Sequence, residues 1–135
     1  MPDSGAFIEQ GADCLFCRWI DAGKAIWTLG SVAAFEDGYP VTKGHLLIVP
    51  LRHTTDGFSM TRQEVRDSES LIRDLAETIR RDDPAVTGFN IGMNIGESAG
   101  QTVFHAHIHL IPRRDGDTDD PKGGVRGVIA GKRCY

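Results

Sequence analysis

The most informative stretch of this chain reads His105-Ala106-His107-Ile108-His109-Leu110-Ile111-Pro112. Three histidines alternate there with apolar residues, and in an extended chain side chains two residues apart share a face, about 6.6 Å from each other. The pattern predicts a strand that lines one surface with three imidazoles and buries its other face in a core. Imidazole has an ordinary pKa of about 6.5, so at neutral pH these rings are mostly uncharged and can act as nucleophiles, proton carriers or metal ligands. We interpret the stretch as a functional site.

Composition restricts the class of protein. The chain has 135 residues, which favours one domain with a real core. Its 40% hydrophobic and 25% charged residues are typical of a soluble protein. The formal net charge of −4 disfavours nucleic acid as a partner, although a local pocket can still take a small phosphate ligand. No apolar run reaches the roughly 18 residues that span a bilayer, and there is no signal-peptide pattern, so we expect a cytoplasmic protein without a membrane partner.

Apolar patterning in the first half of the chain predicts a short helix and three strands. The expected elements are a helix at 15–21, paired strands at 26–29 and 31–35, and a strand at 46–49. Gly30 fits a tight hairpin between the paired strands. The run before Pro50 is apolar without interruption, which predicts a strand that is covered on both faces and stops at the proline.

A long helix is expected to follow Thr61, because Thr61 and Glu64 have the spacing of a capping box. Residues 82–84, Asp-Asp-Pro, end it. Its buried stripe recurs at helical spacing and comprises Val65, Ile72, Leu75, Ala76 and Ile79. Further strands are expected at 88–94, 102–112 and 125–129. Strands, a helix and more strands predict an α+β domain built on an antiparallel sheet.

A glycine-rich loop at 95–101 leads into the histidine stretch. Gly96 and Gly100 allow backbone amides to approach an anionic oxygen, and a histidine beside such a loop is well placed to attack phosphorus. The loop would then stabilise charge on the non-bridging oxygens. The alternative is a turn-forming loop with incidental histidines, and three aligned imidazoles disfavour it.

The cysteines suggest a second kind of chemistry. Three cysteines are an odd number, which argues against a disulfide framework. Cys14 and Cys17 form a C-x-x-C pair, which in a cytosolic chain indicates metal or redox chemistry. Cys134 is expected to be a free thiol.

Residues 94–113 together with 34–37 and 43–50 resemble the signature of the histidine-triad (HIT) superfamily. In that signature three histidines alternate with apolar residues after a glycine-rich phosphate loop, and the similarity runs from Cys14 to Arg113. The chain is therefore identified as a bacterial-type HIT protein related to the histidine-triad nucleotide-binding and fragile-histidine-triad branches. The resemblance implies a HIT-like fold: an antiparallel sheet of about five strands, one long helix and a short N-terminal helix. Residues 1–135 would form a single domain, with 1–12 loosely ordered and 113–135 as a C-terminal loop and tail.

The resemblance also assigns catalytic roles. His107 matches the nucleophile that becomes nucleotidylated, and His109 matches the third triad member, which contacts the phosphate. His45 matches an upstream histidine that supports the active-site hydrogen bonds, although a structural histidine at a strand start fits it equally well. Thr102 matches a hydroxyl position that assists departure of the leaving group.

Nucleotide-binding and metal residues follow from the same resemblance. Asp37 matches a residue that binds the ribose hydroxyls, and its alternative is a turn aspartate before Gly38. The other expected nucleotide contacts are Leu15, Phe16 and Trp19, which form an apolar slot for the base or simply part of the core, and Asn94, Gly100 and Gln101. Some family branches hold structural Zn²⁺ with two cysteines and two histidines, and the corresponding positions here are Cys14, Cys17, His53 and His105. The alternative is that both thiols are merely buried.

These observations favour a nucleotide hydrolase or transferase that acts on the α-phosphate of nucleoside phosphoramidates or dinucleoside polyphosphates and releases a nucleoside monophosphate. Ala106 stands where the transferase branch has proline, which favours hydrolysis. The expected substrate carries a purine, as an AMP or GMP moiety, and the family implies a homodimer joined edge to edge. Two alternatives stay open: a non-catalytic nucleotide-binding protein, and a hydrolase whose triad holds a catalytic zinc ion.

Overall fold

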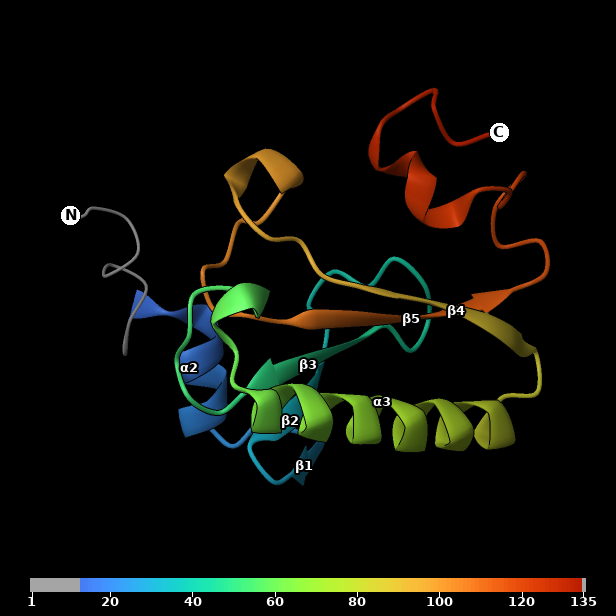
Figure 1. Cartoon of the computed structure of the whole chain (residues 1–135). Helices are drawn as coiled ribbons and strands as arrows, with labels where there is room; N and C mark the ends of the chain where they lie inside the picture. Colours follow the sequence, from blue (N-terminus) through green and yellow to red (C-terminus); the bar gives the residue numbers. More distant parts are fainter. Residues whose placement is uncertain (1–12, 135) are drawn as a thin grey trace.

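The computed structural model describes residues 13–134, so the expectation for residues 1–12 lies outside the described part. Its regular elements are α2 (Leu15–Asp21), β1 (Trp27–Leu29), β2 (Val32–Glu36), β3 (Leu46–Pro50), α3 (Arg62–Asp82), β4 (Val86–Gly92) and β5 (Ile108–Arg114). Three short 3₁₀ helices are η2 (Gly57–Ser59), η3 (Glu97–Ala99) and η4 (Gly124–Val128). The strands form one antiparallel sheet in the order β1-β2-β3-β5-β4 (Figure 1). The predicted α+β fold with five strands, a long helix and a short one is confirmed.

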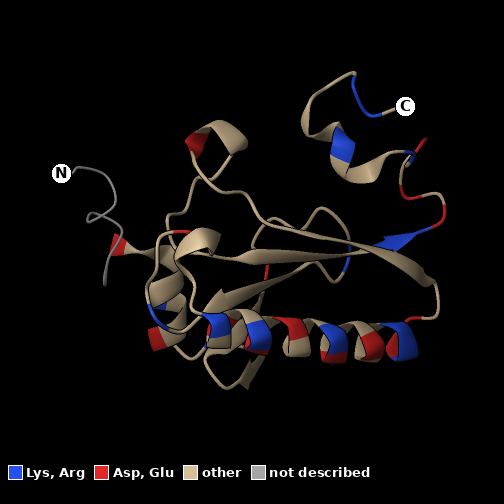
Figure 2. Ribbon diagram, in the orientation of Figure 1, with Lys and Arg blue, Asp and Glu red and all other residues tan. Residues whose placement is uncertain are grey.

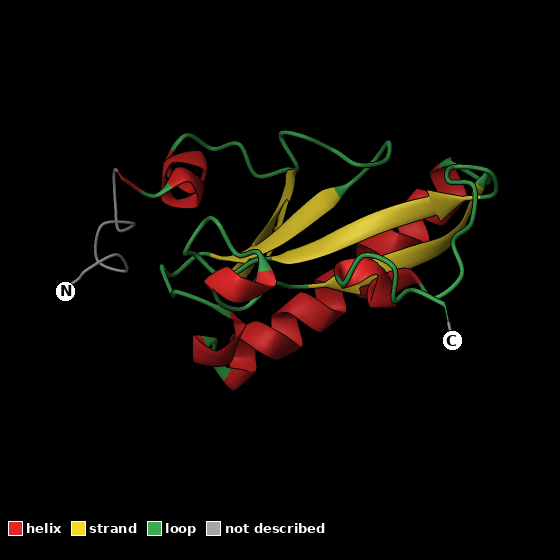
Figure 3. Cartoon of the chain, turned by 90° about the horizontal axis from the view of Figure 1, so that it is seen from above, coloured by secondary structure: helices red, strands yellow, loops and turns green. Residues whose placement is uncertain are grey.

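The two helices cover opposite faces of the sheet. The core beneath α3 contains Val32, Ala34, Leu46, Ile48, Leu71, Ile72, Ile108 and Leu110. The core beneath α2 contains Cys14, Phe16, Ala33, Phe35, Leu47 and Val49. Every residue of β3 is buried, as its unbroken apolar run predicts. Seen from above the sheet, α3 runs beneath the strands (Figure 3). On the face that α2 covers only in part, the remaining surface carries the candidate functional site.

Helix α3 follows its capping box. The Thr61 hydroxyl accepts a hydrogen bond from the Glu64 amide at 3.0 Å, and the Glu64 carboxylate accepts one from the Thr61 amide at 2.8 Å. Ile72 is buried as predicted, but Val65 is 51% exposed. Val65 lies on the predicted stripe and borders an open groove between α3 and β4, where no described residue covers it. Acidic and basic residues recur along this helix (Figure 2).

The strand predicted at 102–112 is wrong in its first half. Strand β5 starts only at Ile108, which pairs with Ile48, and the Ala106 amide donates instead to the Thr54 carbonyl at 2.7 Å. The cause is Pro50, whose nitrogen has no hydrogen to offer to a partner strand. Similarly, β4 occupies 86–92 rather than 88–94.

The final predicted strand, at 125–129, is also wrong. This segment forms η4, and its N-terminal neighbour Gly123 has φ of 86°. A backbone in this left-handed region starts a turn and not a strand. No helix in the described range is both long and apolar enough to cross a membrane.

Candidate active site and metal centre

The three triad histidines separate into two groups. His105 is fully buried and lies with Cys14, Cys17 and His53. The rings of His107 and His109 stay together, with centroids 5.3 Å apart. The expectation that all three imidazoles line one surface is therefore wrong, because residues 105–107 precede the strand and do not alternate as strand residues do.

The first group has the geometry of a tetrahedral metal site. The Sγ atom of Cys14 lies 3.4 Å from Nδ1 of His105, and Sγ of Cys17 lies 3.4 Å from Nδ1 of His53. All four possible ligand atoms lie within 4.8 Å of one another. Zinc with ordinary bond lengths sets sulfur and nitrogen ligands about 3.6 Å apart. The C-x-x-C pair reaches the group because Cys14 is the N-cap of α2 and Cys17 lies in its first turn.

The protonation of His105 suits a metal ligand. Its Nε2 lies 2.8 Å from the Pro50 carbonyl oxygen, which only accepts hydrogen bonds, so Nε2 carries the hydrogen. The lone pair is then on Nδ1, which faces the thiols. Burial lowers the pKa of His105 to about 4, so the ring is neutral at pH 7. A carbonyl that orients a ligand histidine in this way is common around bound metals. These residues fit Zn²⁺.

His107 has the protonation that a nucleophile needs. Its Nδ1 donates to the carbonyl oxygen of His105 at 2.8 Å, which leaves the lone pair on Nε2. Burial lowers the pKa of His107, so the uncharged form dominates at neutral pH. The Phe16 ring packs edge-on against the imidazole, with centroids 4.9 Å apart, and fixes its orientation.

A relay of hydrogen bonds sets the protons on the other two histidines. The Val41 amide donates to Nδ1 of His45 at 3.1 Å, so the hydrogen of neutral His45 is on Nε2. That Nε2 donates to Nδ1 of His109 at 2.9 Å, which leaves His109 with a hydrogen on its outer nitrogen. The pKa values of both rings are lowered, mainly by burial. The Asp37 carboxylate lies 3.4 Å from Nε2 of His45 and favours the protonated form of the pair.

This second group is a poor metal site, although Asp37, His45 and His109 also lie close together. Because Nδ1 of His45 accepts from the Val41 amide, the hydrogen of the neutral ring is on Nε2. A metal at Nε2 would have to displace that hydrogen. Because His105 points into the cysteine cluster, the three triad imidazoles do not converge on one ion. The geometry does not fit the alternative in which the triad is a catalytic zinc centre.

The glycine loop is held by a buried glutamine. Gln101 is 3% exposed, and its side-chain oxygen accepts from the Gly96 amide at 2.9 Å. Its side-chain nitrogen donates to the carbonyls of Thr55 and Val103 at 2.8 and 3.1 Å. These bonds use the Gln101 side chain to hold the shape of the loop. Of the other expected contacts, Thr102 is exposed and Asn94 is half-buried. Gly100 closes the loop in the left-handed conformation, with φ of 97°.

Of the residues expected at the base, Phe16 lies beside His107, and Trp19 packs against Phe16. Trp19 stacks at a tilt on Phe35, with centroids 5.7 Å apart, and both border a cavity of about 400 Å³ that Asp37 also lines. Phe16 and the half-buried Leu15 belong to the core beneath α2. The structure thus places Trp19 and Asp37 at one cavity, and places Phe16 behind His107.

Some contributors carried no recognisable signal in the sequence. Val41 contributes through its main-chain amide and Pro50 through its main-chain carbonyl. Every residue has a carbonyl, and every residue except proline has an amide N–H, so the residue type does not reveal either contribution. Arg52 binds Glu64 through Nε and an Nη atom, at 3.1 and 2.8 Å, and so fastens the segment that carries His53 to α3. Only the position of Arg52 next to His53 hinted at this role.

Comparison with known proteins agrees with the fold and with the triad. A family model described as the HIT domain matches residues 21–116. A HIT family protein from Bacillus anthracis is 38% identical with a TM-score of 0.73, and the match covers 80% of this chain and 78% of that one. A zinc-bound histidine triad family protein from Mycobacterium smegmatis is 31% identical with a TM-score of 0.72, covering 84% and 81%. A histidine triad nucleotide-binding protein from Candida albicans is 28% identical with a TM-score of 0.69, covering 78% of each chain. The chain belongs to the HIT family.

Proposed function

We propose that this protein is a nucleotide hydrolase that cleaves the bond between the α-phosphate and its leaving group in nucleoside phosphoramidates or dinucleoside polyphosphates. The observation that carries the proposal is the hydrogen bond from Nδ1 of His107 to the His105 carbonyl, because it leaves an uncharged Nε2 with a free lone pair. Such a nitrogen is a competent nucleophile toward phosphorus.

The first step forms a nucleotidyl-His107. The lone pair of Nε2 attacks the α-phosphorus, and the bond to the leaving nitrogen or oxygen breaks with its electron pair on the leaving atom. That atom takes a proton through the Thr102 hydroxyl from solvent and departs as an amine, or as a nucleotide. The ring becomes cationic on losing its lone pair to phosphorus, and the Nδ1 hydrogen bond to the His105 carbonyl then strengthens.

The second step is hydrolysis. Water attacks phosphorus, the bond from phosphorus to Nε2 breaks with its pair returning to the ring, and the water proton passes to solvent. The products are a nucleoside monophosphate and free His107. The outer N–H of His109, which the His45 relay defines, donates to a non-bridging oxygen, and the loop closed by Gly100 supplies amides to the same charge.

We propose a purine nucleotide as the substrate moiety, AMP or GMP. Trp19 and Phe35 give the cavity beside Asp37 an aromatic wall, and the Asp37 carboxylate can accept from both ribose hydroxyls. The Candida albicans relative is named as nucleotide-binding, which supports this choice. The geometry favours this reading over non-catalytic binding because a binder has no need of the free lone pair on His107.

We propose a structural zinc ion on Cys14, Cys17, His53 and His105. It would tie α2 to the segment that carries the nucleophile, and it would supply no bond-making step. A cytoplasmic location agrees with reduced, metal-binding cysteines. We also propose a homodimer through β4, whose outer side is a border of the sheet.

The test is a covalent adduct measured by intact mass. Wild-type protein mixed with adenosine 5′-phosphoramidate should gain the mass of an adenylyl group and release AMP, whereas His107→Asn should do neither. The variant should still bind AMP in calorimetry, because asparagine removes the nucleophile and leaves the cavity at Trp19. An undiminished adduct in His107→Asn would overturn the proposal. AMP binding by the wild type, with no release from any adenylated or guanylated ester or amidate, would favour the non-catalytic binder.

A further inference from the structure

The segment between β3 and α3 contacts three parts of the candidate site with three consecutive residues. His53 belongs to the cysteine cluster. The Thr54 carbonyl accepts a hydrogen bond from the Ala106 amide at 2.7 Å. The Thr55 carbonyl accepts one from the Gln101 side chain, in the glycine loop, at 2.8 Å. Of these three contacts, the one at Thr54 leads to the proposed nucleophile.

The Thr54 contact holds the peptide unit that orients His107. The carbonyl of His105 and the N–H of Ala106 belong to one trans peptide, in which these two groups point in opposite directions. The N–H donates to the Thr54 carbonyl at 2.7 Å, and on the other side the oxygen accepts from Nδ1 of His107 at 2.8 Å. A chain of two hydrogen bonds therefore runs from Thr54 through one peptide to the imidazole.

Such a chain fixes both the direction and the strength of the bond to the ring. The peptide is planar, so it cannot turn its oxygen away from His107 without also breaking the bond to Thr54. Hydrogen bonds in series polarise one another, so the bond to Thr54 makes the His105 oxygen a stronger acceptor. The hydrogen bond that a neutral histidine makes decides which ring nitrogen carries the hydrogen. The chain therefore favours a hydrogen on Nδ1 and a free lone pair on Nε2.

Thr54 is itself anchored. It is buried, and its hydroxyl donates to the Ser59 hydroxyl oxygen at 2.8 Å, while the Ser59 hydroxyl donates to the Asp56 carbonyl at 3.0 Å. Arg52 donates to the Ser59 carbonyl at 3.1 Å and to both carboxylate oxygens of the buried Glu64. The hydroxyl of Thr54 thus ties its own carbonyl to a segment that is fastened to the start of α3.

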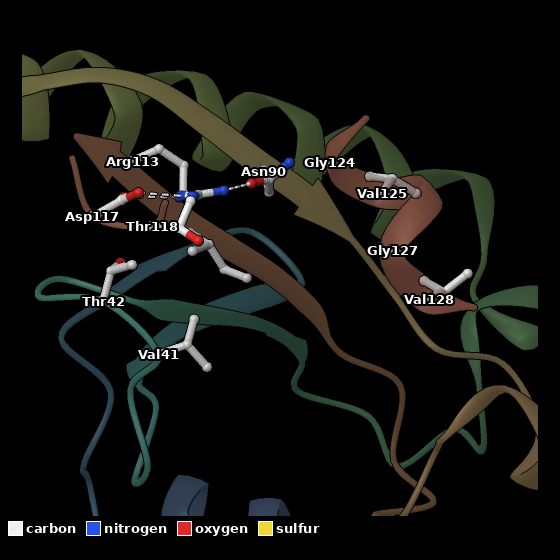
Figure 4. A pocket seen from close by; sticks show the side chains of 11 residues that line it. Val41, Thr42, Asn90, Arg113, Asp117, Thr118, Gly124, Val125, Gly127 and Val128 are labelled. Carbon is white, nitrogen blue, oxygen red and sulfur yellow. Dashed lines mark hydrogen bonds and ion pairs between the residues drawn. The ribbon is translucent and has the colours of Figure 1, made fainter. Parts of the chain in front are cut away.

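Charged side chains farther along β5 give His107 no other support. Arg113 donates to both carboxylate oxygens of Asp117, at 2.9 and 2.7 Å, and to the Asn90 side-chain oxygen at 2.6 Å (Figure 4). These groups satisfy one another at the other end of the strand. Within residues 13–134, the hydrogen bond of the His107 ring is the one to the His105 carbonyl. The orientation of the ring therefore depends on what holds that carbonyl.

We propose that Thr54 is a positioning residue for the proposed nucleophile. Through the peptide between His105 and Ala106, its carbonyl holds His107 in the tautomer and orientation that attack on phosphorus needs, and its hydroxyl keeps that carbonyl in place. The inference rests on the proposed function and adds to it a residue two hydrogen bonds away from the reacting ring. A merely structural hydroxyl would affect folding stability and change nothing at His107.

The first test separates chemistry from binding. Thr54→Val keeps the shape of the side chain and removes its hydroxyl, so kcat for adenosine 5′-phosphoramidate should fall by about tenfold while KM stays within about twofold. Thr54→Ser restores the hydroxyl and should restore kcat. Thr61→Ala is the matched control, because it removes a structural hydroxyl at the nearby cap of α3. With all four proteins folded, a wild-type kcat in Thr54→Val, or an equal loss in Thr61→Ala, would overturn the proposal.

The second test observes the ring without substrate. In ¹⁵N NMR spectra at pH 7, wild-type His107 should carry its hydrogen on Nδ1, and Thr54→Val should show a mixture of both tautomers. The Ala106 amide should exchange with solvent about tenfold faster or more in this variant. Thr54→Ser and Thr61→Ala should resemble the wild type. Metal content, measured by elemental analysis, should be equal in all four proteins, which excludes damage to the neighbouring cysteine cluster as the cause.

Failure of the positioning role can be told apart from failure of the proposed function. If the wild type releases AMP and Thr54→Val does so equally fast, the proposed function stands and the positioning role falls. If the wild type turns over no substrate, the proposed function falls and the spectra decide the role of Thr54. A tautomer mixture in Thr54→Val that Thr54→Ser reverses supports that role, and an unchanged His107 signal overturns it.

Discussion

His105 takes part in both groups of the site, with its ring in the cysteine cluster and with its main-chain carbonyl at His107. Its ring faces Cys14 and Cys17, while its carbonyl accepts the hydrogen of His107. The orientation of His107, the proposed nucleophile, is therefore tied to a residue that belongs to the buried cluster. The sequence predicted which histidines carry the chemistry. Their protonation depends on main-chain atoms of Val41, Pro50 and His105, and no side-chain pattern encodes those.

The pH dependence of activity should reflect the His45–His109 pair. A second proton would put hydrogens on both facing nitrogens and break their 2.9 Å hydrogen bond. Burial lowers both pKa values below the ordinary value of about 6.5, so kcat/KM should hold at pH 6.5 and fall only at lower pH. Folding stability should fall in the same direction, because the unfolded chain takes up protons first as the pH drops.

A variant of Asp37 tests the direction of this pH prediction. Its charge raises the pKa of both histidines, so Asp37→Asn should move the acid limb of the kcat/KM profile to still lower pH. The profile is to be measured from pH 4.5 to 8 on an enzyme that is folded throughout. An acid limb above 6.5, or a shift upward in the variant, contradicts the relay.

Gln101 should act through the loop and not through the nucleotide. Gln101→Ala removes three buried hydrogen bonds, and each unsatisfied group costs about 1–3 kcal/mol, so the urea midpoint should drop clearly. Gln63→Ala is the matched control, because that exposed glutamine bonds only at the surface of α3, and its effect should stay within about 0.5 kcal/mol. Calorimetry should then find AMP affinity reduced, and Gln101→Glu should not restore it, because a carboxylate cannot donate to the Thr55 and Val103 carbonyls. A stable Gln101→Ala protein that loses AMP binding alone would instead indicate direct contact.

At the scale of elements, local signals were sufficient where the interaction itself is local. The capping box at Thr61, the glycine between β1 and β2, and the apolar run of β3 each involve neighbours in sequence. The start of β5 failed because the length of a strand depends on its partner, and here Pro50 of β3 ends the pairing. The face of α3 was placed correctly, but nothing in its own sequence reveals that Val65 borders a groove.

Helix α3 should tolerate damage without loss of chemistry, because it covers the face of the sheet opposite the histidines. Thr61→Ala removes the cap and should cost about 1 kcal/mol in unfolding free energy. Its kcat/KM should match the wild type at a temperature where both are folded. Thr78→Ala, at an exposed position near the C-terminal end of the same helix, is the control and should change stability little. A capping variant with normal stability would mean that Glu64 and Arg52 hold the helix start unaided.

At the scale of the whole molecule, the cysteine cluster joins α2 to the loop before β5. Removing the proposed zinc ion with a chelator should lower Tm by about 10 °C or more, because such an ion would bind the folded chain and not the unfolded one. Cys17→Ser should copy this effect and lose the metal in elemental analysis. Cys134→Ser, which changes an exposed thiol, should keep both. Equal zinc content in the two variants would remove the assignment.

Assembly of two copies should depend on β4. Val65, Ile91 and Met93 are exposed around the groove between α3 and β4. A charge at this place would have to be desolvated on association, so Ile91→Asp should sediment as a monomer where the wild type sediments as a dimer. Trp27→Asp, which alters a similarly exposed residue on β1, should leave the dimer intact. A wild type that is monomeric at micromolar concentration contradicts the proposed assembly.

The unequal borders of the sheet have a consequence for the proposed pairing of two copies. Strand β1 offers three residues to a newcomer, whereas β4 offers seven. Two copies that meet through β4 use up both long borders, and what remains is too short to recruit a third. A chain that pairs in the proposed way would be in effect monovalent, so collisions between copies would end in closed pairs and would not propagate into cross-β fibres.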